Sequence, residues 1–504
     1  MAEEHLNQHR PVGEAAGADI AFFGHPRGLS TLFFTEMWER FSYYGMRALL
    51  ILFLTAAAAD GGFGFDVAGA GAIYGLYTAM VYLLSLPGGW IADRIIGQRR
   101  AVLYGGFLIA AGNYLLVIHS VPVFFGGLLF ITLGTGLLKP NISTIVGQLY
   151  GPSDARRDAG FSIFYMGINL GAFLAPLACG YLGQRINWHL GFGLAGVGMT
   201  LGTIQYWLGQ RHLGDAGLRP TPASTPEGQR RAVRGMWIGV GLFLGTSALL
   251  GALAVSGTAR ITPAAVSNGF GVLLLITVAG LFGWLLLGGD WTEEERKRLV
   301  VVAVLFAASA VFWSLFEQAG STLNLFAQRN TNTTLLSFDF PASWFQSLNS
   351  LYIVSLAPVF AWLWVRLGRR EPSSPAKFVY GLLGAAAGFA ILIYPATQAM
   401  SGALVGPGWL MATYLLHTCG ELCLSPVGLS AMTKLAPARI GGFVMGIWFL
   451  STSVGNYLGG RMASLYEAFD LPALFSAVTG LALVVALVLL ALARPITKMM
   501  GGVR

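Results

Sequence analysis

The first hydrophobic stretch of the chain carries charged residues at the spacing of one helical face. In FFTEMWERFSYYGMR, residues 33–47, successive polar groups lie three, one, three, one and three residues apart: Glu36, Glu39, Arg40, Tyr43, Tyr44 and Arg47. Residues three or four apart share one side of an α-helix, so all six can face one aqueous cavity. The alternative is a ladder of ion pairs that only steadies the helix. A charge at the membrane centre costs roughly 3 kcal/mol or more, whereas such a pair returns only about 0.3 kcal/mol, so we expect a function.

Few other ionisable side chains lie deep in the hydrophobic stretches. They are Lys139, Glu317 and Glu421. The intramembrane set then holds four carboxylates and three cations, so one carboxylate lacks a permanent cation unless Arg461 turns inward. Because burial disfavours the charged form, such a carboxylate can take up and release a proton near neutral pH. A proton-coupled carrier needs a group of this kind.

Neutral polar side chains recur at helical spacing on other stretches. They are Tyr74, Tyr77, Asn169, Trp313, Gln346, Asn349 and Trp448. Taken singly, each tyrosine or tryptophan is as readily explained by packing or by a place at the membrane interface. His417, one turn from Glu421, either modulates that acid or is a core histidine. Convergence with the charged set makes the group a candidate binding site.

The composition is that of a membrane protein with many spans, because 55% of the 504 residues are hydrophobic and only 11% are charged. A helix needs about 20 apolar residues to cross a bilayer. The sequence predicts fourteen such spans, near residues 29–58, 67–91, 101–118, 122–149, 159–182, 188–209, 235–257, 262–288, 299–327, 342–365, 377–397, 405–434, 440–463 and 471–493. No short apolar core with a small-residue cleavage site is present, so we expect the N-terminus to be retained.

Lys and Arg concentrate in every second loop, which places those loops and both termini in the cytoplasm. The net charge of +8 then reflects contact with anionic lipid, and no aromatic-interleaved basic patch points to nucleic acid. Cys179, Cys419 and Cys423 fall inside predicted helices. We expect buried thiols and no metal site, since a C-x3-C pair without companion ligands is a poor one.

The loop after the second span, GGWIADRIIGQRR at residues 88–100, resembles the loop signature of the major facilitator superfamily, with a weaker echo in WVRLGRR, residues 364–370. Such repetition fits an all-α membrane fold of two related six-helix bundles, here with two extra helices between them. The predicted parts are a tail at 1–26, a first bundle at 27–209, a linker at 210–234, a hairpin at 235–290, a second bundle at 291–494 and a tail at 495–504.

Six stretches resemble signatures of the proton-coupled oligopeptide transporter family. They are EMWERFSYYGMR, GTGLLKPNIS, FSIFYMGINLGAF, FWSLFEQAGS, WFQSLNS and GELCLSPVGLS, and the resemblance runs from Phe34 to about Gly460. It implies that Arg40 and Lys139 hold a peptide's carboxylate, a role suited to cations. It assigns the peptide's amino terminus to Glu421, Asn169 and Asn349, the peptide backbone to Tyr44 and Tyr77, and side-chain pockets to Trp313 and Trp448.

The resemblance also implies proton coupling through Glu36, Glu39, Arg40 and Glu317, and gating ion pairs Arg47–Glu317 and Lys139–Glu421. We therefore predict a monomeric symporter that imports di- and tripeptides by alternating access across a bacterial inner membrane, with the proton as coupling ion and no other cofactor. A nitrate or small-anion carrier is the alternative, although nitrate has no amine for Glu421 to bind. An intramembrane enzyme lacks support from paired Asp residues, G-x-S-x-G or H-E-x-x-H. A peptide sensor that does not transport is also disfavoured, because the sequence shows no appended soluble domain.

Overall fold

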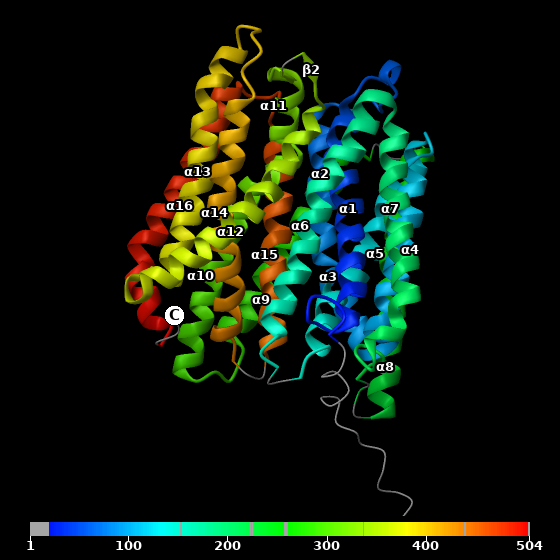
Figure 1. The fold of residues 1–504 in the computed structure, drawn as a ribbon, viewed down its shortest axis with the longest axis vertical. Helices are drawn as coiled ribbons and strands as arrows, with labels where there is room; N and C mark the ends of the chain where they lie inside the picture. Colours follow the sequence, from blue (N-terminus) through cyan, green and yellow to red (C-terminus); the bar gives the residue numbers. More distant parts are fainter. Residues whose placement is uncertain are drawn as a thin grey trace, which may run out of the picture. The chain divides into compact units, whose positions relative to one another are not determined.

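The structure is a computed structural model that describes residues 20–151, 154–221, 223, 225–256, 261–335, 337–437 and 440–501. Helices make up nearly all of its regular structure (Figure 1). Their bounds are α1 Arg27–Thr55, α2 Val67–Leu83, α3 Ser85–Ile91, α4 Gln98–Leu116, α5 Val121–Gln148, α6 Arg157–Tyr181, α7 Trp188–Gly209, α8 Pro226–Ser256, α9 Pro263–Leu287, α10 Glu293–Phe316, α11 Thr322–Asn330, α12 Ser347–Leu367, α13 Ser374–Ala399, α14 Gly408–Leu435, α15 Gly441–Ala463 and α16 Leu471–Met499. The strands β1 Thr334–Leu335 and β2 Phe338–Asp339 form a small antiparallel hairpin.

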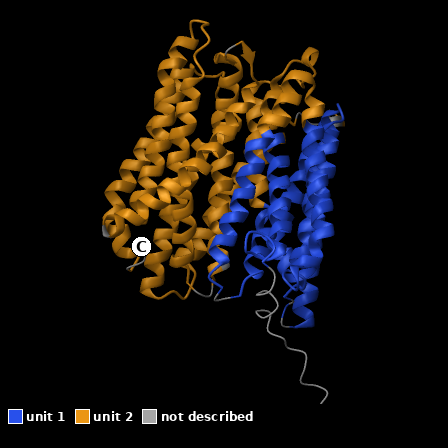
Figure 2. Cartoon of the chain, in the orientation of Figure 1, with its two compact units in different colours: residues 1–45, 84–175, 192–255 blue, residues 46–83, 176–191, 256–504 orange. Residues whose placement is uncertain are grey.

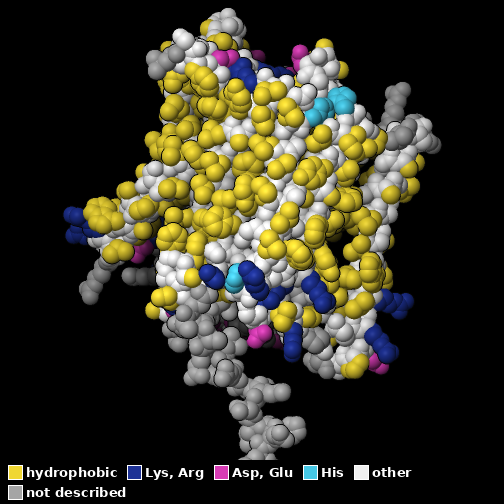
Figure 3. Space-filling view, turned by 45° about the vertical axis from the view of Figure 1, so that its right-hand side comes forward, with side chains coloured by type: hydrophobic (Ala, Val, Ile, Leu, Met, Phe, Trp, Pro, Cys, Tyr) yellow, Lys and Arg dark blue, Asp and Glu magenta, His cyan; other side chains and the backbone are white. Residues whose placement is uncertain are grey.

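Each of the fourteen predicted spans is a helix or a broken helix, which confirms the all-helical membrane fold. Within the described part of the chain, nine segments are long and apolar enough to cross a membrane by length and composition. Helices α1, α4, α7, α14 and α15 are long too, but charged, polar or small residues lower their hydropathy. Hydrophobic side chains cover most of the face in Figure 3, as expected of a surface that meets lipid tails.

Local sequence signals set the starts of two helices. α10 begins at a capping box, in which Thr292 Oγ1 accepts from Glu295 N at 3.2 Å and Glu295 Oε2 accepts from Thr292 N at 2.9 Å. α9 begins with Pro263 after Thr262, whose hydroxyl caps Ala265 N at 3.2 Å. At these two helices the sequence therefore marks the start of the helix as well as its apolar run.

Three predicted boundaries differ from the observed elements. α8 begins at Pro226, inside the predicted linker 210–234, because Pro suits a first helical turn and polar Gln and Arg residues continue a helix as readily as apolar ones. α16 runs to Met499, inside the predicted tail 495–504. The predicted span 299–327 is broken by the 3-10 turn η5, Glu317–Gly320, between α10 and α11. Residues 1–19 of the predicted tail 1–26 lie outside the described residues.

Contacts divide the chain into two compact units (Figure 2). Unit 1 holds residues 1–45, 84–175 and 192–255, and unit 2 holds residues 46–83, 176–191 and 256–504. This division differs from the predicted bundles 27–209 and 291–494 with the hairpin 235–290, which stay predictions.

In unit 1, α4 and α5 pack through facing glycines. A Cβ at Gly105 would lie 2.6 Å from Gly134 O, and a Cβ at Gly112 would lie 2.7 Å from Gly127 O. Only small residues allow helices to approach this closely. These glycines hold α5, the helix that carries Lys139, against its neighbour.

Also in unit 1, the segment after α7 is hydrogen-bonded to the start of α4. Arg99 is buried and its Nε donates to Ala216 O at 2.6 Å, while its Nη2 donates to Gly214 O. The Arg99 backbone N–H donates to Gly217 O at 3.0 Å, and Gln148 Oε1 accepts from Gly217 N at 2.6 Å. Arg99 belongs to the loop signature, so this motif has a structural role in fixing the chain that follows the sixth span.

In unit 2, α2 and α15 are joined by side chains that donate to backbone carbonyls of α2. Ser453 Oγ donates to Ala79 O at 2.7 Å, and Asn456 Nδ2 donates to Thr78 O at 3.1 Å. A Cβ at Gly75 would lie 2.8 Å from Gly460 Cα, so the two helices touch backbone to backbone there. The contact fixes α2 and therefore Tyr74 and Tyr77.

Candidate functional site

In unit 1, Arg40 lies between two glutamates on the same helix. Its Nε is 2.8 Å from Glu36 Oε1 and 2.7 Å from Glu39 Oε2, and all three side chains are at most 5% exposed. A single Nε–H can point at only one acceptor, and the one that meets hydrogen-bond geometry is Glu36. Two acids therefore share one guanidinium edge.

Glu39 is the acid of the two that does not accept the hydrogen bond from Arg40 Nε. Its side chain is 0% exposed, and neither carboxylate oxygen has a hydrogen-bond donor in the part of the chain that the structure describes. A buried carboxylate without donors is costly as an anion, and protonation removes that cost. The arrangement can therefore bind a proton at Glu39 while Glu36 keeps its hydrogen bond with Arg40.

The other predicted residues of unit 1 lie on α5, on α6 and further along α1. Lys139 lies on α5 and is half-buried. Asn169, on α6, is buried and its Nδ2 donates to Tyr165 O at 3.0 Å. A Cβ at Gly171 would lie 3.0 Å from Arg40 Cβ, so α6 passes close to the charged stretch of α1. Tyr44, near the end of the unit 1 part of α1, is half-buried.

In unit 2, Arg47 and Glu317 form an ion pair with 2.9 Å between Nη2 and Oε2. Arg47 Nε also donates to the Tyr74 hydroxyl at 2.7 Å, and the two charged residues are 4% and 5% exposed. The break at η5 places Glu317 at the C-cap of α10. A Cβ at Gly320 would meet the Tyr74 hydroxyl and lie 2.7 Å from Arg47 Nε, so the turn approaches the pair closely.

Glu421 accepts a hydrogen bond from an amide in unit 2. Asn349 Nδ2 donates to Glu421 Oε2 at 2.9 Å and lies 3.0 Å from Thr418 Oγ1, which shares its helix with Glu421. His417 is 2% exposed, and a Cβ at Gly388 would lie 2.5 Å from its Nε2. The ring fits against a glycine and packs on Phe389 at 5.1 Å between centroids, which is the setting of a core histidine.

The predicted aromatic residues of unit 2 pack in two places. Trp313 lies on α10 with its ring 5.4 Å from both Phe312 and Phe316, between centroids. Trp448, on α15, is buried 6.3 Å from Phe378. Tyr77 on α2 and Gln346 in the turn before α12 are buried as well; these two are the remaining predicted polar residues of unit 2.

The structure thus brings together Glu36, Glu39 and Arg40, and separately Arg47 with Glu317 and Asn349 with Glu421. Three contributors are absent from the predicted site: Gly320, Thr418 and, as a partner of Arg47, Tyr74. Thr418 is three residues before Glu421, so helical spacing could have found it. Gly320 gave no such signal. The predicted pair Lys139–Glu421 and the substrate roles of all these residues stay predictions.

Comparison with known proteins gives a consistent result over most of the chain. Residues 99–480 match the family profile described as PTR2, POT family. The peptide transporter YePEPT of Yersinia enterocolitica is 43% identical, over 95% of this chain and 96% of its own. A di-/tripeptide transporter of Lactococcus lactis subsp. cremoris is 38% identical, over 96% and 98%. The crystal structure of a peptide transporter POT in complex with sulfate is 46% identical with a TM-score of 0.90, over 96% and 97%.

Proposed function

Because the chain belongs to the POT family, we propose that it is a secondary active transporter that imports di- and tripeptides together with protons. The observation that carries the proposal is the arrangement of Arg40 between Glu36 and Glu39, with Glu39 buried and without hydrogen-bond donors among the described residues. The relatives in Yersinia and Lactococcus are peptide transporters, which supports peptides as the substrate class.

The remaining predicted residues suit a substrate that carries a negative charge at one end and a positive charge at the other, as a short zwitterionic peptide does. Arg40 and Lys139 supply positive charge for the peptide's carboxylate, where charge-assisted hydrogen bonds are strongest. Glu421, with its oxygen held by Asn349, supplies negative charge for the ammonium group. Recognition of the two termini lets side chains vary, and Trp313 and Trp448 would line the space for them.

The coupling step follows from competition for Arg40. With Glu39 charged, the arginine is shared between two carboxylates and is unavailable to a substrate. Protonation of Glu39 removes one competitor, so the guanidinium can turn to the peptide's carboxylate. Loss of the proton on the cytoplasmic side restores the pair and discharges the peptide.

The driving force is sufficient for accumulation. One proton moving through a potential of about 100 mV supplies about 2.3 kcal/mol. A gradient of about one pH unit adds about 1.4 kcal/mol. At tenfold per about 1.4 kcal/mol, a peptide can be concentrated on the order of several hundred-fold.

Alternating access would use the ion pair Arg47–Glu317 as one gate and the pair Lys139–Glu421 as the other. By the positive-inside rule both termini are cytoplasmic, and the short loops fit a bacterial inner membrane. We propose that one chain suffices for transport, since its own residues supply groups for both ends of the substrate.

The test is uptake of labelled dialanine into proteoliposomes with an acid exterior and a negative interior. The proposal expects accumulation that collapses with an uncoupler and is inhibited by unlabelled tripeptide but not by nitrate. No accumulation of dialanine beside uptake of nitrate would replace the peptide by a small anion. Equal uptake without a gradient would remove proton coupling from the account.

A further inference from the structure

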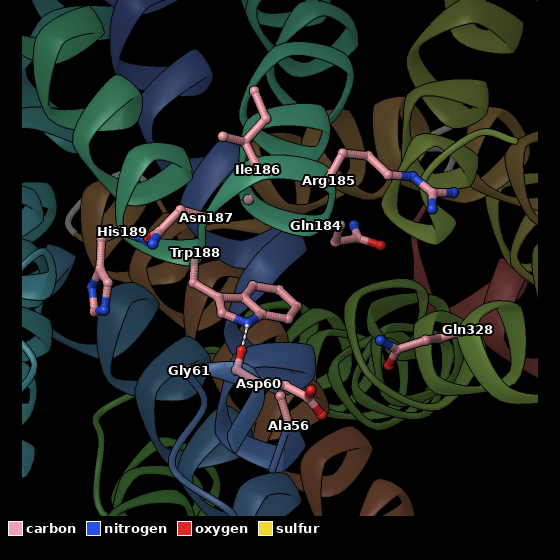
Figure 4. Close-up of a pocket in the computed structure, with 11 residues that line it drawn as sticks. Ala56, Asp60, Gly61, Gln184, Arg185, Ile186, Asn187, Trp188, His189 and Gln328 are labelled. Atoms are coloured by element: carbon pink, nitrogen blue, oxygen red, sulfur yellow. Dashed lines mark hydrogen bonds between the residues drawn. The ribbon is translucent and has the colours of Figure 1, made fainter. Parts of the chain in front are cut away.

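Unit 2 contains a cavity that the proposed transport site does not use. It has a volume of about 560 Å³, within the range of small-molecule pockets, and part of its wall is drawn in Figure 4. Its lining comes from three segments: the turn after α1, the turn that joins α6 and α7, and α11. The positive-inside rule places all three on the external side, so the cavity opens where substrate arrives.

The wall is polar and carries one uncompensated charge. Figure 4 shows Asp60, Gln184 and Gln328 around the space beside the Trp188 ring. None of the ion pairs among the described residues involves Asp60, whose side chain is exposed to the cavity. An exposed carboxylate with amide groups beside it attracts a cation with N–H donors.

Arg185 also lines the cavity, but its guanidinium is already paired with a carboxylate. Arg185 Nη2 lies 2.8 Å from Asp339 Oδ1 and 3.2 Å from Phe340 O, and its guanidinium points away from the Trp188 ring (Figure 4). The charge of Arg185 is therefore balanced by the β hairpin that carries Asp339. Asp60 therefore gives the lining of the cavity a negative charge. A negative lining favours an ammonium group over a carboxylate.

Backbone geometry keeps Asp60 beside the indole. Trp188 Nε1 donates to Asp60 O at 3.0 Å, which orients the ring. Gly61 has φ +78°, a left-handed conformation that glycine adopts without strain, and a Cβ there would lie 3.6 Å from Trp188 Cδ1. The Trp188 ring and the Asp60 carboxylate line the same cavity, and both attract positive charge, so together they favour an ammonium ion.

We propose that this cavity is an external binding site for the N-terminal ammonium group of a peptide, held by Asp60, the face of Trp188 and the carboxamides of Gln184 and Gln328. The inference rests on the proposed peptide import. It adds a binding site on the external side that a peptide occupies before it reaches the transport site. It concerns capture from outside only, so it predicts an effect on one face of the membrane.

The test compares initial rates of labelled dialanine influx into intact cells with rates in inside-out vesicles, which present the other face. Asp60→Asn removes the charge at nearly constant shape. In cells it should raise the half-saturating external concentration of dialanine about fivefold, which is the size expected of one exposed charged contact. The maximal rate in cells and the half-saturating concentration in the vesicles should both stay unchanged. Asp60→Glu should stay within about twofold of the wild type, since it keeps the charge.

Asp66→Asn is the matched control. Asp66 belongs to the same external loop but caps Gly69 N at 2.8 Å and is outside the lining, and asparagine can keep that cap. It removes the same charge and should leave half-saturation unchanged. Equal values for Asp60→Asn and the wild type, or an equal shift in Asp66→Asn, would overturn the external site while leaving import intact. Absence of dialanine uptake by the wild type would overturn the proposed function itself.

Discussion

Replacing Glu317 with glutamine should leave Arg47 as a buried cation without its carboxylate. The two groups are 2.9 Å apart and their side chains are 5% and 6% exposed, so water cannot replace the lost partner. Removing one partner of a buried ion pair costs about 3–5 kcal/mol of unfolding free energy. The Tyr74 hydroxyl still accepts from Arg47 Nε, and the glutamine carbonyl can accept from Nη2. We therefore expect the lower end, about 3 kcal/mol.

The control makes the same change at an exposed pair. Glu467 Oε1 is 2.6 Å from Arg329 Nη1, but the two side chains are 52% and 37% exposed. Glu467→Gln should cost less than about 1 kcal/mol, because solvent screens and solvates the remaining charge. The two variants differ in burial and not in chemistry.

The assay is reversible unfolding of the purified protein in mixed micelles, with the free energy of unfolding extrapolated to native conditions. A double variant, Arg47→Met with Glu317→Gln, should recover at least half of the loss, because no buried cation remains. A loss in Glu317→Gln no larger than that in Glu467→Gln would refute the reasoning. So would a double variant whose loss equals the sum of the losses measured for Glu317→Gln and Arg47→Met singly.

Three further predictions concern the close packing at Gly320, the hydrogen bonds of Arg99 and the ion pair between Arg156 and Asp154. Gly320→Ala should lower the free energy of unfolding by about 1–3 kcal/mol by pushing a methyl group into the buried ion pair, whereas Gly280→Ala, with nothing within 4 Å, should not lower it; the same micelle assay decides. Arg99→Met should speed proteolysis within residues 210–221 by removing the hydrogen bonds that hold this segment, and an unchanged cleavage rate would contradict that role. Hydrogen bonds from Arg156 lower the pKa of Asp154 to about 2, below its ordinary value of 3.8. The stabilisation is therefore present above about pH 4 and lost as pH falls toward 2. The stability difference between wild type and Asp154→Asn should shrink over that interval, and a constant difference would contradict the assignment.

The spans and the charged stripe of α1 could be predicted because each depends on local sequence. Apolar length marks a span, and three- and four-residue spacing puts Glu36, Glu39 and Arg40 on one face. The same spacing rule indicates why Thr418 accompanies Glu421. These inferences need no knowledge of which helices are neighbours.

Contacts between distant segments could not be predicted in this way. The partner of Arg47 Nε is Tyr74 because α2 has a particular register, and register depends on close backbone contacts such as Gly75 with Gly460. The pair Arg185–Asp339 likewise needs the hairpin that turns at Ser337, whose φ is +69°. Hydropathy also misplaced the start of α8, because it detects the part of a helix that is apolar and not the polar turns that continue it.

The most direct measurement of the central claim uses Glu39→Gln in proteoliposomes and compares gradient-driven accumulation of dialanine with its exchange across the membrane at equal pH. If the proton binds at Glu39 and frees Arg40, the variant mimics the protonated state permanently: it should exchange peptide at a rate near that of the wild type but not concentrate it. Accumulation by Glu39→Gln that still follows the proton gradient would contradict the assignment and place the coupling proton on another carboxylate.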